Sequence, residues 1–395
     1  MTNRAIAHAR LRNSRLVGAP LETPAEVVGW FGAVQAQDIP GSLWGISQRI
    51  GRTGGIGMDA GMAPGGGVGR VGGIALNRDG PTLGELWAAL DSGRVVRTHG
   101  PRPTWHVLAP EDLRWTLGLV GPRVAQSMAS MTRRFGITAG DIGRAVTAMR
   151  SAMAGGAALT RPELRDVIAS VGIDVTAPLA SGIVGMHAEL AAVICNGPRR
   201  ARQPTFVLVD EWVSPDPVPA LAAADALREL TIRYFRSHGP ALAHDMAWWS
   251  GLTVGSVREG LALAGPALVG RTIDGRDYWA AAGAFDPGPE LVAREHVLLL
   301  PNYDEYLGSY RDYGPIFDAA LPRARTVADV LGTHLVVRDG LVVGGWRRAL
   351  GRDRVTVTAI LLMPLAPAEL DALAQEVDRF GRFLGLPAAL EFRNG

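Results

Sequence analysis

Residues 224–280 read "ADALRELTIRYFRSHGPALAHDMAWWSGLTVGSVREGLALAGPALVGRTIDGRDYWA", and their pattern gives the clearest indication of the fold class. Three helical patterns in it are separated by "SHGP" and "SGLT". A strand, a turn and a second strand follow, and the pair Asp274-Gly275 at the turn is a strong hairpin signal. Three helices followed by a two-stranded wing predict a winged helix-turn-helix module.

The same order of elements can be read twice more along the chain. Residues 159–213 contain "LTRPELRDVIAS", "GMHAELAAVIC" and then a basic turn and strand, "GPRRARQPTFVLVDEWV". Residues 1–110 contain "AHARLRNSRLV", "PAEVVGWFGAVQAQ", "TLGELWAALDSG" and a final hairpin, "RVVRTHGPRPTWHVLAP". We therefore predict three tandem winged helix-turn-helix modules.

Strands predominate after residue 290, with a second Asp-Gly turn at Asp339-Gly340, and a helix over "APAELDALAQEVDRFGRFLG" closes the chain. The expected class is α+β, and the last part is expected to be a β-rich, barrel-like domain with a closing helix. The predicted boundaries are 1–120, 121–215 and 216–287 for winged helices 1, 2 and 3, and 288–395 for the C-terminal domain.

Composition excludes several classes of protein. All 40 basic residues among the 395 are arginines, and the net charge is +2. Arginine suits bidentate contacts to phosphate, and without lysine no side-chain amine is available for Schiff-base chemistry. The single cysteine, Cys195, excludes internal disulfides and thiolate metal clusters. No apolar run reaches the roughly 18 residues of a membrane span, and the N-terminus has no signal-peptide core, so we expect a cytoplasmic protein without membrane contact.

No sequence motif indicates a metal or a cofactor. H-E-x-x-H, C-x-x-C, G-x-S-x-G and P-loop patterns are absent from the sequence. The glycine-rich stretch 51–81 contains a G-x-G-x-x-G match at Gly67, Gly69 and Gly72, but no strand precedes it, so we read a flexible insertion. We expect neither a nucleotide cofactor nor any other. His187, His244 and His296 are isolated and are read as structural.

Two glutamines form the first candidate site. In "GWFGAVQAQDIPGSLWG", residues 29–45, Gln35 and Gln37 follow an apolar helix that Thr23 can cap with Pro24 at its first position. Side chains two apart point roughly 200° away from each other on a helix but the same way on extended chain. The pair therefore fits best just past the helix end, presented side by side, and the alternative is that the amides satisfy buried backbone groups.

Three further places carry candidates, each with a plainer alternative. Arg97, Arg102 and His106 surround the wing-like turn in "RVVRTHGPRPTWHVL", which is otherwise a solvated hairpin. Asp304 and Tyr310 lie in "LLLPNYDEYLGSYRD", where the alternative is an internal ion pair with Arg311. The basic turn is typical of a phosphate-contacting wing, or is an ordinary solvated loop. Its arginines are Arg199, Arg200 and Arg202.

The chain resembles the AlkZ and YcaQ family of bacterial winged-helix DNA glycosylases. The resemblance rests on "AVQAQD", "VVRTHGPRPTWHVL", "LLPNYDEYLGSYRD" and "VVGGWRR", which occur in the family's order over almost the whole sequence. Its Gln-x-Gln motif looks like the AlkZ branch, in which the two glutamines position the attacking water. The resemblance thus implies that Gln35 and Gln37 are catalytic and that the partner is double-stranded DNA.

The implied protein is a monofunctional DNA glycosylase that acts as a monomer and leaves an abasic site. Its expected substrate is N7-alkylguanine, including bulky natural-product adducts or interstrand crosslinks. The resemblance also allows a self-resistance role in a bacterium that makes a DNA-alkylating toxin. A winged-helix transcription regulator without catalysis is the alternative, because tandem wings and a basic surface would look much the same. The glutamine pair discriminates between the two, since a regulator has no need of it.

Overall fold

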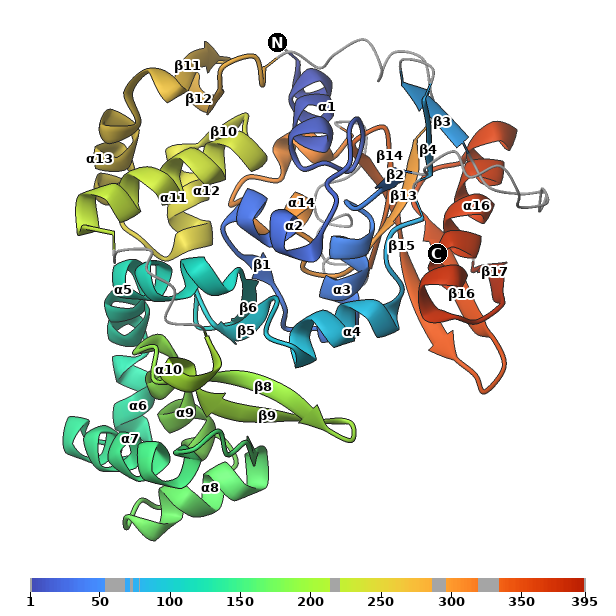
Figure 1. Ribbon diagram of the computed structural model, residues 1–395. Helices are drawn as coiled ribbons and strands as arrows, with labels where there is room; N and C mark the ends of the chain where they lie inside the picture. The colour runs from blue at the N-terminus through green and yellow to red at the C-terminus, as the bar shows by residue number, and fades with distance from the viewer. Residues whose placement is uncertain are drawn as a thin grey trace.

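The structure is a computed structural model that describes residues 2–53, 68–71, 74–77, 79–213, 221–285, 296–318 and 334–393. It is a mixed α+β fold. In Figure 1 the N-terminal helices lie at the centre, the C-terminal sheet and its helix lie to the right, and two largely helical lobes lie to the left. No helix of the described residues is long and apolar enough to cross a membrane.

The N-terminal part combines helices with a small antiparallel sheet of order β1-β6-β5. Thr23 accepts a hydrogen bond from the Glu26 backbone and Pro24 opens the second helix, as predicted. This helix ends at Phe31, so Gln35 lies on the strand that follows, opposite His106. The elements are α1 (Asn3–Asn13), α2 (Pro24–Phe31), β1 (Val34–Gln35), α3 (Ile39–Ser47), α4 (Leu83–Asp91), β5 (Val96–His99) and β6 (Trp105–Leu108).

Helix α3 is absent from the sequence prediction, because one proline and two glycines in nine residues lower its helix propensity. The same glycines allow the helix to approach the loop after residue 300. A Cβ at Gly41 would lie 3.2 Å from Pro301, and one at Gly45 would lie 2.8 Å from an Asp304 carboxylate oxygen. The glycines are therefore required for packing next to the candidate site.

The middle lobe is helical with a three-stranded antiparallel sheet, β7-β9-β8. Its first three helices, between residues 110 and 153, were not predicted. Met149 and Met153 of α7 are buried in the same core as Ile168 and Phe206, so tertiary packing stabilises this region. The elements are α5 (Pro110–Ser127), α6 (Ala129–Arg134), α7 (Ala139–Met153), β7 (Leu159–Thr160), α8 (Arg161–Ser170), α9 (Ala180–Leu190), β8 (Ile194–Arg200), β9 (Gln203–Leu208) and α10 (Val209–Trp212).

The third lobe contains the elements predicted for residues 224–280. Three helices precede a hairpin, and Asp274 and Gly275 have φ angles of 48° and 72°, as the tight turn requires. A short strand before the second helix makes the sheet three-stranded, β10-β12-β11. The elements are α11 (Ala223–Ser237), β10 (Ala241–Leu242), α12 (Ala243–Ser250), α13 (Val254–Ala264), η1 (Gly265–Ala267), β11 (Leu268–Ile273) and β12 (Arg276–Ala281).

The C-terminal part is an open five-stranded sheet in the order β13-β14-β15-β16-β17, so the barrel-like prediction is wrong for the described residues. After α16, the last strand runs parallel to β16 and extends the sheet rather than closing it on β13. The Asp339-Gly340 turn is confirmed. The elements are β13 (Val297–Leu300), α14 (Glu305–Gly308), η3 (Gly314–Ile316), β14 (His334–Arg338), β15 (Leu341–Leu350), β16 (Val355–Leu361), α16 (Pro367–Leu384) and β17 (Ala388–Phe392).

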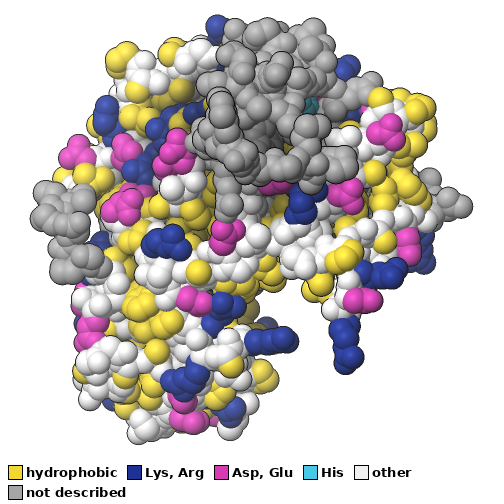
Figure 2. Space-filling view, turned by 45° about the vertical axis from the view of Figure 1, so that its right-hand side comes forward, with side chains coloured by type: hydrophobic (Ala, Val, Ile, Leu, Met, Phe, Trp, Pro, Cys, Tyr) yellow, Lys and Arg dark blue, Asp and Glu magenta, His cyan; other side chains and the backbone are white. Residues whose placement is uncertain are grey.

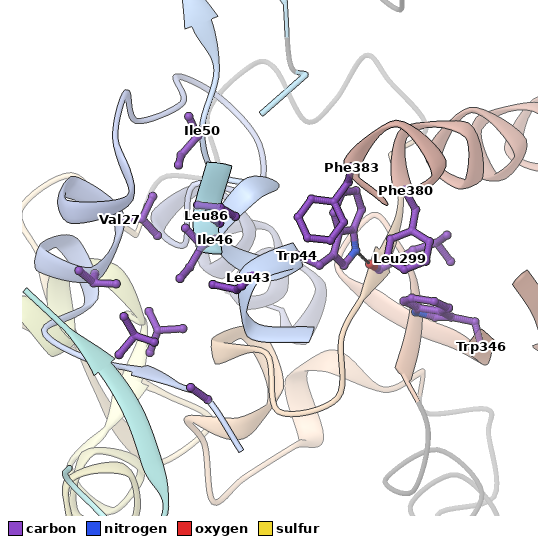
Figure 3. Packing of buried hydrophobic residues seen from close by; sticks show 14 of the residues in the cluster. Val27, Leu43, Trp44, Ile46, Ile50, Leu86, Leu299, Trp346, Phe380 and Phe383 are labelled. Atoms are coloured by element: carbon purple, nitrogen blue, oxygen red, sulfur yellow. Dashed lines mark hydrogen bonds between the residues drawn. The ribbon is translucent and has the colours of Figure 1, made fainter. Parts of the chain in front are cut away.

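The first and last parts of the chain share one hydrophobic core (Figure 3). The ring of Trp44 on α3 lies 5.2 Å from that of Phe380 and 5.1 Å from that of Phe383, both on α16. The Trp44 indole also donates a 2.7 Å hydrogen bond to the Leu299 carbonyl of β13. These contacts hold α3, and with it the segment just before it that carries the two glutamines, against the C-terminal part.

Part of the glycine-rich stretch has a described backbone. Strands β2 (Arg52–Thr53), β3 (Val68–Val71) and β4 (Ile74–Asn77) form an antiparallel sheet of order β2-β4-β3. The prediction of a flexible insertion falls largely on residues 54–67, 72–73 and 78, which lie outside the described residues. The G-x-G-x-x-G match depends on Gly67 and Gly72, which are among them.

Candidate active site

The two glutamines lie just past the end of α2, but their surroundings differ. Gln35 is buried on β1, whereas Gln37 is exposed two residues further on. Both amide oxygens accept hydrogen bonds from the β5–β6 hairpin: Gln35 from Arg102 in the turn at 2.6 Å, and Gln37 from the backbone of Trp105, the first residue of β6, at a longer 3.4 Å. One amide is therefore firmly held, and the other is loosely held and accessible.

Arg102 fixes the orientation of the Gln35 amide. Its guanidinium donates to Gln35 Oε1 through Nη2 and to the Gly308 carbonyl through Nη1, the latter at 3.2 Å. A guanidinium has only donors, so the amide atom that faces it must be the oxygen. Burial lowers the pKa of Arg102, and the negative charge of Glu305 opposes that shift.

Glu305 supports Gln35 from the interior and belongs to the same candidate stretch as Asp304 and Tyr310, although the sequence assigned it no role of its own. Its Oε1 accepts a 2.6 Å hydrogen bond from the Gln35 backbone, and its Oε2 accepts from Trp249 at 3.0 Å and from the Ser309 hydroxyl. Burial alone would raise its pKa, but hydrogen bonds and the charge of His238, at 3.3 Å, lower it to about 2. The carboxylate is therefore ionised and has four protein partners.

The other residues predicted around the wing-like turn, Arg97 and His106, are buried in the interior. Arg97 is buried and donates to the Ala36 carbonyl at 3.1 Å and to Asn196 of β8 at 2.6 Å, and burial lowers its pKa to about 10. His106 is fully buried, with Nδ1 2.9 Å from the Thr104 carbonyl. Burial, reinforced by the charge of Arg102, lowers its pKa to about 3, so His106 is neutral at pH 7.

Asp304 and Tyr310 are buried supports rather than surface contacts. Asp304 forms a two-pronged ion pair with Arg49 of the α3 end, at 2.9 and 2.7 Å, so the expected pairing with Arg311 is wrong. The reason is that Asp304 caps α14 and faces α3, while the Arg311 backbone donates to Asp245 instead. The Tyr310 hydroxyl donates to the His238 carbonyl at 2.7 Å.

The basic turn lies between β8 and β9, away from the glutamines. Arg199 is held by Asp91 at 2.6 Å and stacks on Trp87, whereas Arg200 pairs with Glu163 at the surface and Arg202 is exposed. Strand β8 connects this tip to the site, because its Asn196 contacts Arg97. The tip is therefore roughly 13 Å from that contact, four strand residues away.

A concave face lies between two parts of the molecule. Figure 2 shows a hollow between the lobe at lower left and the lobe at lower right, with basic side chains standing out from both sides. In Figure 1 the β8–β9 and β15–β16 hairpins both extend from the lower side of the fold. The second hairpin carries three exposed arginines, Arg347, Arg352 and Arg354.

Comparison with known proteins identifies the class of enzyme. A family model described as "DNA glycosylase AlkZ-like" matches residues 76–383, and the chain belongs to this family of DNA glycosylases, which act in DNA repair. Because the members of this family are enzymes, the alternative prediction of a non-catalytic transcription regulator is wrong. Gln35 and Gln37 precede the residues that the family model matches. No curated protein matches the chain.

The fold is also that of a solved structure. The chain is similar to the Streptomyces sahachiroi DNA glycosylase AlkZ, with a TM-score of 0.73 and 22% sequence identity over 100% of both chains. This likeness includes the N-terminal segment that carries the two glutamines.

Proposed function

We propose that the protein hydrolyses the N-glycosidic bond of N7-alkylguanine in double-stranded DNA and that Gln35 and Gln37 hold the attacking water. The observation that carries this proposal is the pair itself: a buried amide held by Arg102 at 2.6 Å lies beside an exposed, loosely held amide that a ligand can reach. A fixed group and an accessible group on one short extended segment can orient a water between them.

The chemistry requires no strong acid or base. Alkylation at N7 puts a positive charge on guanine, so the base leaves as a neutral molecule without a proton donor. The sugar then acquires oxocarbenium character, and carbonyl dipoles that face it are stabilising. Each carbonyl oxygen has two lone pairs, so Gln35 can accept a water hydrogen while Arg102 occupies the other lone pair. Normal, neutral purines are poor leaving groups and remain in the DNA.

The neighbours of the pair fit this role. His106, with a pKa of about 3, is neutral at pH 7 and cannot act as a general acid there. Glu305, with a pKa of about 2, is ionised, and its negative charge acts against the positive charge of Arg102. Without lysine, a side-chain amine cannot cleave the abasic product by β-elimination, so we propose a monofunctional glycosylase.

We further interpret the three helical parts as winged helices with the boundaries predicted from sequence, and the exposed arginines of the hairpins as contacts to phosphate. Gripping the duplex from its backbone would let the enzyme process bulky natural-product adducts or interstrand crosslinks that cannot be flipped out of the helix. Such an activity fits a self-resistance role in a bacterium that makes a DNA-alkylating toxin, and the arginine-only basic composition supports a high-GC source.

The test is release of the base from a duplex that carries a single N7-methylguanine, followed by strand cleavage in hot alkali. Gln35→Ala and Gln37→Ala should each slow release about 10²- to 10³-fold, the loss typical for one transition-state hydrogen-bonding group. Gln375→Ala, at an exposed glutamine of α16, is the control and should match the wild type. Wild-type binding without release of simple or bulky adducts would refute the proposal.

A further inference from the structure

Three aromatic side chains are exposed among the described residues, and two of them belong to segments that contact the residues around Gln35. Trp248 is 48% exposed, Tyr303 is 41% exposed, and the third, Phe392, lies on the edge strand β17 at 54%. The other large aromatic side chains of these residues are buried or partly buried in the protein. Exposed aromatic rings beside a site that acts on DNA indicate stacking on bases.

Trp248 is tied to the site through its helix and through Arg102. The neighbouring Trp249 is buried and donates to Glu305 at 3.0 Å, which fixes this turn of α12 against the interior. Successive residues of a helix point about 100° apart, so Trp248 faces outward. The Arg102 guanidinium that holds Gln35 lies 5.8 Å from the Trp248 ring. The indole therefore lies at the edge of the hydrogen-bonded cluster around Gln35.

The Tyr303 backbone lies near the site. A Cβ at Gly308 would lie 3.3 Å from both Gln35 Oε1 and the Tyr303 carbonyl, which places the two oxygens near each other. The Tyr303 backbone has a φ of 67°, a left-handed conformation that is strained for a bulky residue. The buried pair of Asp304 with Arg49 holds the next residue in place. Strain of this kind clusters at functional sites, where the surrounding structure maintains it.

We propose that Trp248 and Tyr303 are the walls of a binding site for the planar, positively charged face of an N7-alkylated base that is turned out of the helix, as a small adduct such as a methyl group permits. This inference rests on the proposed function and names how the substrate is selected. A cation is attracted to the negative face of an aromatic ring, most strongly to tryptophan, whereas a neutral base gains only stacking. The walls would favour the damaged base before any bond breaks, and the glutamines would then act on its glycosidic bond.

The test measures binding apart from chemistry. The probe is a duplex with one N7-methylguanine on a 2′-fluoroarabinose sugar, which resists hydrolysis, compared with the same duplex without the methyl group. Trp248→Leu and Tyr303→Leu should each weaken binding of the methylated duplex about fivefold or more, as expected for one lost stacking contact, and affect the unmodified duplex much less. Trp248→Phe and Tyr303→Phe keep a ring and should retain most of the preference. Phe392→Leu is the matched control and should bind as the wild type does.

Two results would overturn the inference. Equal weakening on both duplexes would mean that the rings stack on undamaged bases without selecting the lesion, and unchanged binding would mean that they are not walls of the site. Thermal melting of each variant verifies folding, and the Phe variants report on the ring if a Leu variant is unstable. Failure of the proposed function looks different: the wild type itself would release no N7-methylguanine.

Discussion

The interior around Gln35 and the tip of the β8–β9 hairpin use the same residue type in opposite ways. Around Gln35, Arg49 and Arg102 are each held by two or more protein acceptors within 3.2 Å. At the hairpin tip, Arg200 also has two acceptors, Glu163 and the Ala158 carbonyl, but its side chain stands at the surface, and Arg202 is exposed. The two regions therefore differ in exposure: the less exposed arginines orient the site, whereas exposed tip arginines such as Arg202 are available to a charged partner.

The difference has a physical basis. Orientation requires side chains that cannot move, and burial with hydrogen bonds to fixed protein acceptors provides this at the cost of removing charges from water. Grip on DNA requires charges that can exchange counter-ions for phosphates, and only exposed arginines can do so. A single sequence therefore separates the two tasks by burial rather than by residue type.

The largest expected effect is on stability. Arg49→Ala leaves the Asp304 carboxylate buried without its partner, at a cost of about 3–5 kcal/mol in the free energy of unfolding. Arg200→Ala breaks an ion pair of similar length, 2.6 Å against 2.7 Å, but at the surface, and should leave the melting temperature almost unchanged. Thermal melting of the two variants tests the contrast, and equal shifts would contradict it.

The features that could be predicted correctly from the sequence are local ones. The Asp274-Gly275 and Asp339-Gly340 hairpins and the Thr23 cap depend on a few neighbouring residues, so they can be read from the chain. Helix α3 could not be, since its glycines are explained only by close contact with residues 301–304. The open sheet depends on β17, which pairs in parallel with β16, and no local sequence pattern predicts that pairing.

The candidate site shows the same limit. The position of Gln35 past the end of α2 follows from helix period alone, but its contact with Glu305 joins residues 270 positions apart. Sequence reasoning offered Arg311 as the partner of Asp304 because it is near in the chain, whereas Arg49, 255 positions away, is near in space. Charge pairing was therefore correctly expected, but its partner depended on the tertiary fold.

A smaller effect is expected on the rate of base release, and it distinguishes the arginines that orient the site from the exposed arginines at the hairpin tip. Arg102→Met removes a charged donor from Gln35 and should slow base release in single turnover about 10- to 100-fold, equivalent to about 1.5–3 kcal/mol for a hydrogen bond to a charged group. The Kd for undamaged duplex should change little. Arg202→Met should instead raise that Kd and reduce the slope of log affinity against log salt by about 0.9, with the release step intact. If Arg102→Met altered only the salt dependence, Arg102 would be a phosphate contact instead of a positioning residue.

The smallest effect concerns pH and a histidine in the same interior. Burial lowers the pKa of His106 from 6.5 to about 3 in the folded state. Between these values the unfolded chain binds a proton that the native protein does not, so acidification destabilises the fold by up to about 1.4 kcal/mol per pH unit. His106→Gln removes this group and should reduce the loss of stability between pH 7 and 5.5 by about 1 kcal/mol, whatever its effect at pH 7. His244→Gln, at an exposed position on α12, is the control. Chemical denaturation at the two pH values measures the difference, and an unchanged pH dependence in His106→Gln would show that His106 is protonated as readily in the fold as outside it.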